Sequence, residues 1–172
     1  MATPDAGRQG SGRWVVVLPL EPLRAGDVFS VGQWPLHVTL VEPFTTAIDA
    51  DALGAALEPL AASTAPVPVT IGPDALFGPK HDIPVSLVED GGRLAPLRAD
   101  AQDALRALAV DLRHPRTDYR PHVTAKRHGR VREGDRLTLE LLTLVRLRPP
   151  ETSHHGRIAG SWPLSGHTGS AA

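Results

Sequence analysis

A chain of 172 residues with 41% hydrophobic and 22% charged side chains has the size and composition of one globular domain with its own core. It contains no cysteine, which excludes disulfides, thiolate nucleophiles and cysteine-based zinc sites. Its net charge of −1 gives the molecule as a whole no bias toward nucleic acid.

Both ends of the chain are rich in glycine, serine and alanine, so we expect disordered tails at residues 1–12 and 165–172 around one domain at residues 13–164. The apolar run at residues 14–20 is far shorter than the ~20 residues of a membrane-spanning helix. The first residues lack the order of a signal peptide, since no sustained apolar stretch follows them. We therefore expect a cytoplasmic protein without a membrane segment.

The first half of the domain predicts strands around one helix. In chain order the expected elements are a buried strand, a second strand, a helix and two short strands, at residues 14–20, 36–41, 45–62, 67–71 and 83–88. Thr46 or Asp49 is suited to begin the helix, because a short oxygen-bearing side chain accepts a hydrogen bond from a free backbone N–H there. Pro59 is expected to end the helix early, since proline lacks that N–H.

The second half predicts the same kinds of element. A turn at Asp90-Gly91-Gly92 precedes a helix and three strands, at residues 93–112, 122–126, 137–147 and 157–164. The apolar stripe of this helix consists of Leu94, Leu97, Ala101, Leu105, Leu108 and Leu112. Arg98 lies mostly off the stripe. Each half thus holds one long helix with several strands, and we predict an α+β fold in which the halves cover each other.

The tripeptide His-Val-Thr occurs twice, each time on a predicted strand: His37-Val38-Thr39 and His122-Val123-Thr124. Side chains alternate between the faces of a strand, so the histidine and threonine of each motif share one face while the valine points to the core. If the halves are related by an approximate two-fold axis, both motifs face one cleft. Eight histidines predict about one accidental His-x-Ser/Thr, and no histidine outside these two motifs has Ser or Thr two positions on.

Two imidazoles and two hydroxyls around one small volume suit an in-line displacement at phosphorus. One neutral imidazole removes a proton from the attacking water or hydroxyl, and the other, protonated, gives a proton to the departing oxygen. Free imidazole titrates near about 6.5, so a pair with opposite protonation states is readily populated near neutral pH. This chemistry needs no metal or other cofactor, and it leaves open which histidine is the base.

Positive charge is concentrated around the second motif. Residues 113–136 hold eight basic and three acidic side chains, a local charge of +5 that leaves −6 on the rest of the chain. A phosphate site would gain from this potential, although a solvated basic loop explains the charge equally well. Arg127, or else Lys126, is the auxiliary phosphate donor that we expect beside the threonine hydroxyls.

Three aromatic residues are candidates for contact with a substrate: Trp34 before the first motif, Tyr119 before the second, and Phe77 in a Gly/Pro-rich connection. Each could stack on a base, although packing is the more frequent role of a lone aromatic residue. The pair His154-His155 does not predict a metal site, because neighbours on a strand face opposite sides and no acidic cluster accompanies them.

The paired motifs resemble those of the 2H phosphoesterase superfamily, which is defined by two His-x-Thr/Ser motifs in a duplicated fold. Residues 37–44, HVTLVEPF, are similar to the His-x-Thr-Leu-x-x-Pro-Phe form of its bacterial 2′-5′ RNA ligase-like branch. Residues 121–127 resemble the second motif, with a basic residue five positions after the histidine, and residues 157–164 end in Trp-Pro-Leu like the family's last strand. The resemblance spans residues 14–164.

The resemblance implies two pseudo-symmetric lobes, each an antiparallel sheet with outer helices, around a central cleft. It implies His37 and His122 as the acid–base pair and Thr39 and Thr124 as ligands of the phosphate. Family activities include the opening of 2′,3′-cyclic phosphates, hydrolysis of ADP-ribose 1″,2″-cyclic phosphate and reversible 2′-5′ RNA joining. Glu42 departs from the better-known RNA ligases, and an acidic residue fits a phosphate site only if it points away.

We therefore predict a monomeric, metal-independent phosphodiesterase that opens the cyclic phosphate of an RNA 3′ end or of a phosphorylated small molecule, and that could also join 2′-5′ RNA ends. The main alternative is a non-catalytic module of the same fold that binds nucleotides or RNA ends. Two further hypotheses are a metal-dependent hydrolase with scattered histidines and a purely structural domain.

Overall fold

The computed structural model describes residues 11–113, 115–149 and 155–168. In chain order the elements of this part are β1 (Gly12–Pro19), β2 (Val28–Phe29), the 3₁₀ helix η1 (Val31–Gln33), β3 (His37–Thr46), α1 (Ala50–Ser63), β4 (Val67–Phe77), β5 (Ile83–Glu89), α2 (Leu94–Ala107), β6 (His122–Thr124), β7 (Arg136–Leu139), β8 (Leu141–Leu147) and β9 (Gly156–Pro163). The helices do not alternate with single strands along the chain, and the predicted α+β class is confirmed.

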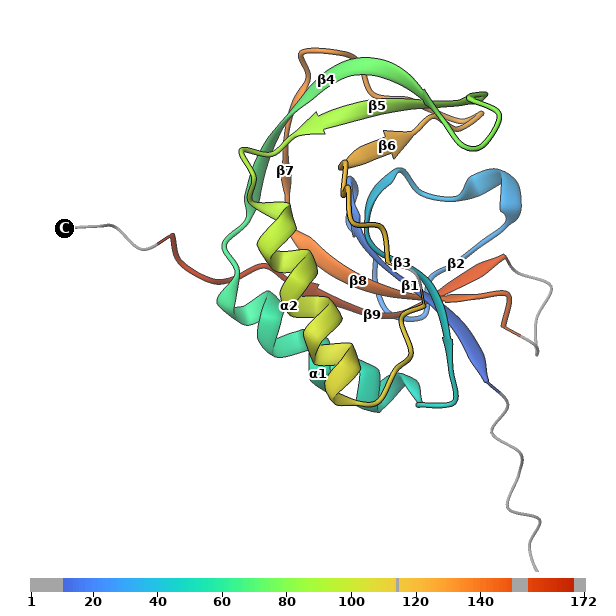
Figure 1. Ribbon diagram of the computed structural model, residues 1–172, viewed down its shortest axis with the longest axis vertical. Coiled ribbons are helices and arrows are strands. Elements are labelled where there is room, and N and C mark those ends of the chain that lie inside the picture. Colours follow the sequence, from blue (N-terminus) through green and yellow to red (C-terminus); the bar gives the residue numbers. More distant parts are fainter. Residues whose placement is uncertain (1–10, 114, 150–154, 169–172) are drawn as a thin grey trace, which may run out of the picture.

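All of these strands join one antiparallel sheet in the order β2-β9-β8-β1-β3-β6-β5-β4-β7. The sheet is curled: β4, β5 and β6 arch over the top of Figure 1, and β1, β3, β8 and β9 lie below them. The two halves of the sheet meet between β3 and β6, through the single residue pair Val38 and Val123. The two lobes expected from the sequence are therefore the two halves of a continuous sheet.

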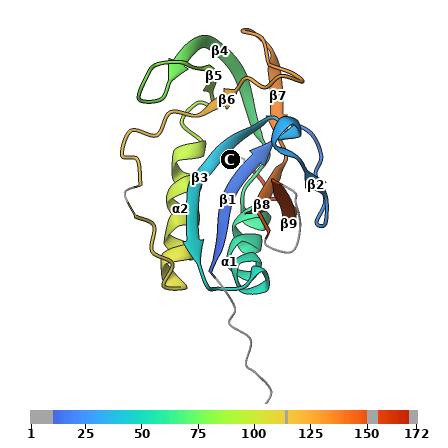
Figure 2. The same ribbon diagram turned by 90° about the vertical axis from the view of Figure 1, so that its right-hand side faces the viewer.

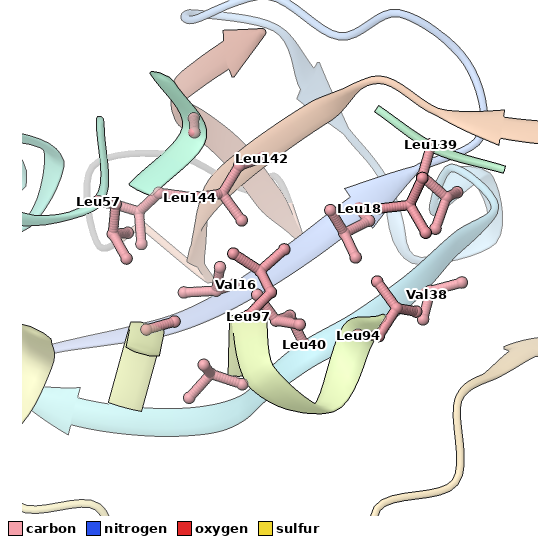
Figure 3. Close-up of a cluster of buried hydrophobic side chains, with 14 of the residues drawn as sticks. Val16, Leu18, Val38, Leu40, Leu57, Leu94, Leu97, Leu139, Leu142 and Leu144 are labelled. Carbon is pink, nitrogen blue, oxygen red and sulfur yellow. The ribbon is translucent and has the colours of Figure 1, made fainter. Parts of the chain in front are cut away.

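Both α-helices lie side by side against one face of the sheet (Figures 1 and 2). α1 packs on β8 and β9, and α2 packs on α1 and β3, so the helices share the first half of the sheet instead of covering one lobe each. Figure 3 shows the apolar layer between the helices and the sheet, which includes Val16, Leu18, Val38, Leu40, Leu57, Leu94, Leu97 and Leu144. No helix in the described part of the chain is long and apolar enough to cross a bilayer.

The first helix begins where a capping residue was expected but ends later. Asp49 is the cap, since its carboxylate accepts a hydrogen bond from the Ala52 N–H at 2.8 Å. Pro59 does not end the helix, which continues to Ser63. Proline has no N–H to donate to the carbonyl four residues earlier, which here is the carbonyl of Ala55. Ala55 and Pro59 are both exposed. Water can therefore satisfy that carbonyl, and the proline is tolerated.

The expected strand at residues 137–147 is two strands that part at Glu140. β7 pairs with β4 at one edge of the sheet, whereas β8 pairs with β1 and β9 in the other half. The chain thus crosses from one half to the other within a run that has no glycine or proline to mark the change. β2 and η1 were not predicted, because segments of two or three residues are too short for a periodic pattern.

The chain stays packed beyond residue 164, where the C-terminal tail was expected to begin. The N–H groups of Ser165 and Gly166 donate to the carbonyls of Ala61 and Thr64 at the end of α1. The remaining parts of both expected tails, residues 1–10 and 169–172, lie outside the described residues.

Candidate active site

The pairing of β3 with β6 brings the two His-Val-Thr motifs side by side. Val38 lies opposite Val123 in an antiparallel register, so His37 is the neighbour of Thr124, and Thr39 is the neighbour of His122. Both valines are buried in the core beneath the helices, which directs the histidines and threonines to the opposite face. His37 and His122 are thus diagonal neighbours, whose positions on adjacent strands lie about 7–8 Å apart, close enough for both side chains to contact one phosphate group.

The two imidazoles are anchored in the same way. Nδ1 of His37 donates to the carbonyl of Pro35 at 2.6 Å, and Nδ1 of His122 donates to the carbonyl of Arg120 at 2.8 Å. A carbonyl oxygen can only accept, so each neutral ring carries its proton on Nδ1. Nε2 of each ring is therefore left with a lone pair, and it is the atom that can take up or release a proton.

The two histidines differ in how deeply their rings are buried. Burial lowers the pKa of His37 to about 4, and the positive charges of Lys126 and His122 act in the same direction against the hydrogen bond to Pro35. Burial also lowers the pKa of His122, with the charges of Arg116 and Arg120 adding to it. The hydrogen bond of His122 is exposed whereas that of His37 is partly buried, so His37 is the ring held more firmly in its neutral form.

An aromatic ring stands beside each histidine. The ring centroid of Trp34 is 4.3 Å from that of His37, and the centroid of Phe77 is 4.7 Å from that of His122. Trp34 also stacks on Phe29 at 4.2 Å and belongs to the small apolar cluster on this face, while the guanidinium of Arg120 lies over Phe77 at 5.0 Å. Both rings border the site, and they also cause part of the desolvation of the imidazoles.

Tyr119, the third aromatic candidate, lies on the helix side of β3 and not beside a histidine. Its hydroxyl donates to the backbone carbonyl of Thr39 at 2.8 Å, and the guanidinium of Arg98 lies over its ring at 4.6 Å. Burial raises the pKa of the phenol, which stays protonated and can keep this bond. The ring packs against the core on the helix side, so Tyr119 contacts the first motif through its backbone and supports β3 from behind.

Of the two basic residues considered as phosphate donors, Lys126 faces the site. It follows His122 and Thr124 at even spacing, is half-buried, and its charge lowers the pKa of His37. Burial in turn lowers the pKa of its own ammonium group. Arg127 is exposed. β6 ends at Thr124, earlier than the expected strand at residues 122–126, and Lys126 forms a separate β-bridge with Gly129. The difference between the two residues is therefore set by the folded structure.

Glu42 points away from the site, as a phosphate requires. Its carboxylate is paired with the guanidinium of Arg98 at 2.8 Å, on the helix face of the sheet. Arg98 was expected mostly off the buried stripe of α2, but its side chain is only 5% exposed. It also donates to the carbonyls of Leu40 at 2.7 Å and Arg116 at 3.1 Å, which explains how a charged residue is accommodated there.

Three residues of the site were not anticipated. A pocket of about 240 Å³ adjoins His37, and its polar lining includes Arg13 of β1 and the pair Arg148 and His155 at the ends of β8 and β9. The N–H of Arg148 donates to the carbonyl of His155 at 2.7 Å. No motif marks these positions, because residues from three strands meet only in the folded sheet; His154 lies outside the described residues.

An antiparallel α+β fold that presents two His-x-Thr motifs from adjacent strands is the arrangement of a 2H phosphoesterase. The chain matches the model of the 2′-5′ RNA ligase superfamily over residues 15–157, and it belongs to that superfamily. No curated protein matches it in sequence.

The solved structures similar to this chain share its fold at low identity. TT0787 of Thermus thermophilus aligns with a TM-score of 0.64 and 17% identity, over 90% of this chain and 99% of that one. LigT of E. coli in complex with 3′-AMP aligns with a TM-score of 0.57 and 14% identity, over 91% of this chain and 99% of that one. The complex of LigT with NADP⁺ aligns with the same TM-score and identity, over 90% and 98%.

Proposed function

We propose that the protein is a phosphodiesterase that opens a cyclic phosphate by acid–base catalysis with His37 and His122. The register of β3 against β6 is the observation that supports this proposal, since both motifs share one face of the sheet and the two histidines are diagonal neighbours at positions about 7–8 Å apart. The matching Nδ1 hydrogen bonds add to it, because they leave Nε2 of both rings free to accept or donate a proton.

His37 is the proposed base and His122 the proposed acid. With a pKa lowered to about 4, His37 is neutral near neutral pH and can accept the proton of an attacking water at Nε2. The water oxygen then bonds to phosphorus as the bond from phosphorus to one ribose oxygen breaks. His122, the more exposed ring, gives its Nε2 proton to that ribose oxygen, and a ribose phosphomonoester is released.

The negative charge that develops on the phosphate needs donors that are already in position. Thr39 and Thr124 lie on the same face as the histidines, one beside each, and their hydroxyls can donate to the non-bridging oxygens. Lys126 supplies a positive charge on that face. Donors placed in advance around a partly dry site stabilise such charge more than water does.

The proposed substrate is a 2′,3′-cyclic phosphate at the end of an RNA or on a nucleotide. Structures of E. coli LigT contain 3′-AMP, ATP, NADP⁺ or phosphate, and this supports a phosphorylated nucleotide as the ligand of the present chain. We further propose that the protein acts as a monomer, because both histidines come from one chain and meet within one sheet.

Hydrolysis of adenosine 2′,3′-cyclic phosphate, with and without a chelator, tests the proposal. We expect turnover that the chelator leaves unchanged and that His37→Ala or His122→Ala reduces by about 10²-fold or more, the usual contribution of a positioned acid or base. Saturable binding without turnover would favour a non-catalytic nucleotide-binding module, and activity lost in chelator would favour a metal-dependent hydrolase.

A further inference from the structure

The pocket beside His37 extends the site on one side only. Its lining comes from β1, β3 and the ends of β8 and β9, so it lies on the β1 side of the first motif, and neither His122 nor Thr124 borders it. Its volume of about 240 Å³ is far larger than the single water molecule that hydrolysis requires at the proposed base. The pocket therefore has room for a further chemical group of the substrate.

The lining of this pocket is cationic. Among the described residues, its charged and titratable lining consists of Arg13, His37, Arg148 and His155, and none of the described lining residues is an aspartate or glutamate. Within the part of the chain that the structure describes, the ion pairs involve Arg98, Arg106, Arg113 and Arg130, so Arg13 and Arg148 carry charges that no carboxylate there neutralises. Burial lowers the pKa of His155, and the positive charges of Arg148 and Lys126 act in the same direction.

The backbone at Arg148 is held in an uncommon conformation. Its φ of 47° lies in the positive region of backbone conformation, which residues other than glycine rarely adopt. The hydrogen bond from its N–H to the carbonyl of His155 keeps the two residues together at the pocket. Such a conformation persists where the surrounding structure enforces it.

We propose that this pocket binds a second phosphate group of the substrate, held by Arg13 and Arg148 with His155 beside them. The preferred substrate would then be a cyclic phosphate joined to another phosphate or phosphodiester, such as an oligonucleotide end, over a nucleoside cyclic phosphate that has no other charge. Paired guanidinium groups are suited to this ligand, because each can donate two parallel hydrogen bonds to phosphate oxygens. The inference rests on the proposed phosphodiesterase function.

The test compares two substrates that differ in one group: adenosine 2′,3′-cyclic phosphate with a 5′-hydroxyl and the same compound with a 5′-phosphate. At physiological salt, we expect kcat/KM of the wild-type protein to be at least about tenfold higher for the 5′-phosphorylated substrate, the effect of one charge-assisted hydrogen bond. Arg148→Gln and Arg13→Gln are each expected to bring the ratio of kcat/KM for the 5′-phosphorylated substrate to kcat/KM for the 5′-hydroxyl substrate close to one.

Arg132→Gln is the matched control, since Arg132 is exposed in the turn before β7 and its substitution removes the same charge away from the pocket. We expect it to leave the ratio unchanged. A wild-type ratio near one, or a ratio that survives both pocket substitutions, would overturn the second phosphate site. A ratio that falls equally in Arg132→Gln would also overturn it, because general attraction of charge would then explain the preference.

A binding measurement separates this inference from the catalytic proposal. Equal turnover of both substrates would leave the phosphodiesterase function in place while refuting the second site. If neither substrate is turned over, the proposed function fails, and calorimetry with 3′-AMP and adenosine 3′,5′-bisphosphate decides on the pocket. About tenfold tighter binding of the bisphosphate, lost in Arg148→Gln, supports the site, and equal affinity for the two ligands refutes it.

Discussion

His37 and His122 illustrate how much of a site is set by single side chains and their nearest backbone groups. Each ring is held by a carbonyl two residues before it, and each stands against an aromatic ring. The two differ in burial, and this difference rather than the motif distinguishes a proposed base from a proposed acid. Residue-scale predictions therefore concern protonation and charge.

The pH dependence of turnover tests the assignment of base and acid. The free enzyme requires His37, with a pKa of about 4, to be neutral, and His122, with a pKa lowered from its usual value of 6.5, to be protonated. Both conditions hold between the two values, so we expect a bell-shaped kcat/KM with its maximum on the acidic side of about pH 6.5. Bound phosphate favours both imidazolium forms, so the kcat profile should lie at higher pH. A kcat/KM maximum well above neutral pH would contradict the assignment.

Lys126 and Arg127 form a matched pair of neighbouring cations. Lys126 is half-buried, and its charge adds to the effect of burial in lowering the pKa of His37, whereas Arg127 is exposed. We expect Lys126→Met to lower kcat/KM by about 10²-fold, as loss of a donor to the developing charge does, and Arg127→Met to have a much smaller effect. Steady-state kinetics on adenosine 2′,3′-cyclic phosphate provides the measurement. A larger loss in Arg127→Met would mean that the exposed side chain is the phosphate donor.

At the scale of elements, α2 and the segment before β6 are tied to β3 by Arg98. This buried side chain pairs with Glu42, donates to the carbonyls of Leu40 and Arg116, and lies over the ring of Tyr119. Tyr119 in turn holds the carbonyl of Thr39. Both motifs are thus supported from the helix side of the sheet by one polar network.

Removing Arg98 is expected to destabilise the fold. Arg98→Met leaves Glu42 and two carbonyls without their partner, and we expect the free energy of unfolding to fall by about 3 kcal/mol. Arg106→Met breaks an exposed pair with Asp103 at 3.7 Å and should cost about 0.5 kcal/mol or less. Urea denaturation of both variants makes the comparison. Equal losses would show that the network around Arg98 contributes nothing beyond a surface ion pair.

The start of α1 offers a smaller test at the same scale. Asp49 caps the helix through the Ala52 N–H, whereas Thr46 accepts from the Ile48 N–H before the helix begins. We expect Asp49→Ala to lower the free energy of unfolding by about 1 kcal/mol and Thr46→Ala to lower it by less. Thermal or urea unfolding of the two variants would rank them, and the reverse order would mean that Thr46 is the effective cap.

At the scale of the whole molecule, two halves of one sheet share one core. The halves pair only between Val38 and Val123, but residues of both halves belong to a single apolar cluster against the helices, from Leu18 of β1 to Val69 of β4 and Leu139 of β7. A core shared in this way cannot come apart in one half without exposing the other.

We therefore expect the domain to unfold in one cooperative transition. Tryptophan fluorescence reports mainly on the first half, since Trp14 lies in β1, Trp34 beside β3 and Trp162 in β9, while far-UV circular dichroism reports on both halves. The urea transitions followed by the two methods should coincide. Two separated transitions would mean that the halves of the sheet fold as independent units.

The recurrence of His-Val-Thr and the alternation of side chains along a strand were enough to predict the paired motifs, the α+β class and the family, because these properties depend on spacing within short segments. The same local rules failed at Pro59 and Arg98, where the outcome depends on whether solvent or a partner from another element meets the group. Patterns along the chain do not carry that information.

Only the tertiary structure decided how the motifs face each other and what surrounds them. The register of β3 against β6, the burial that separates His37 from His122, and the meeting of Arg13 with Arg148 and His155 all depend on segments that are distant in the chain. The physical reason is that strand order in a sheet is fixed by long-range pairing and by burial of the common core, whereas each segment by itself determines only which of its side chains share a face.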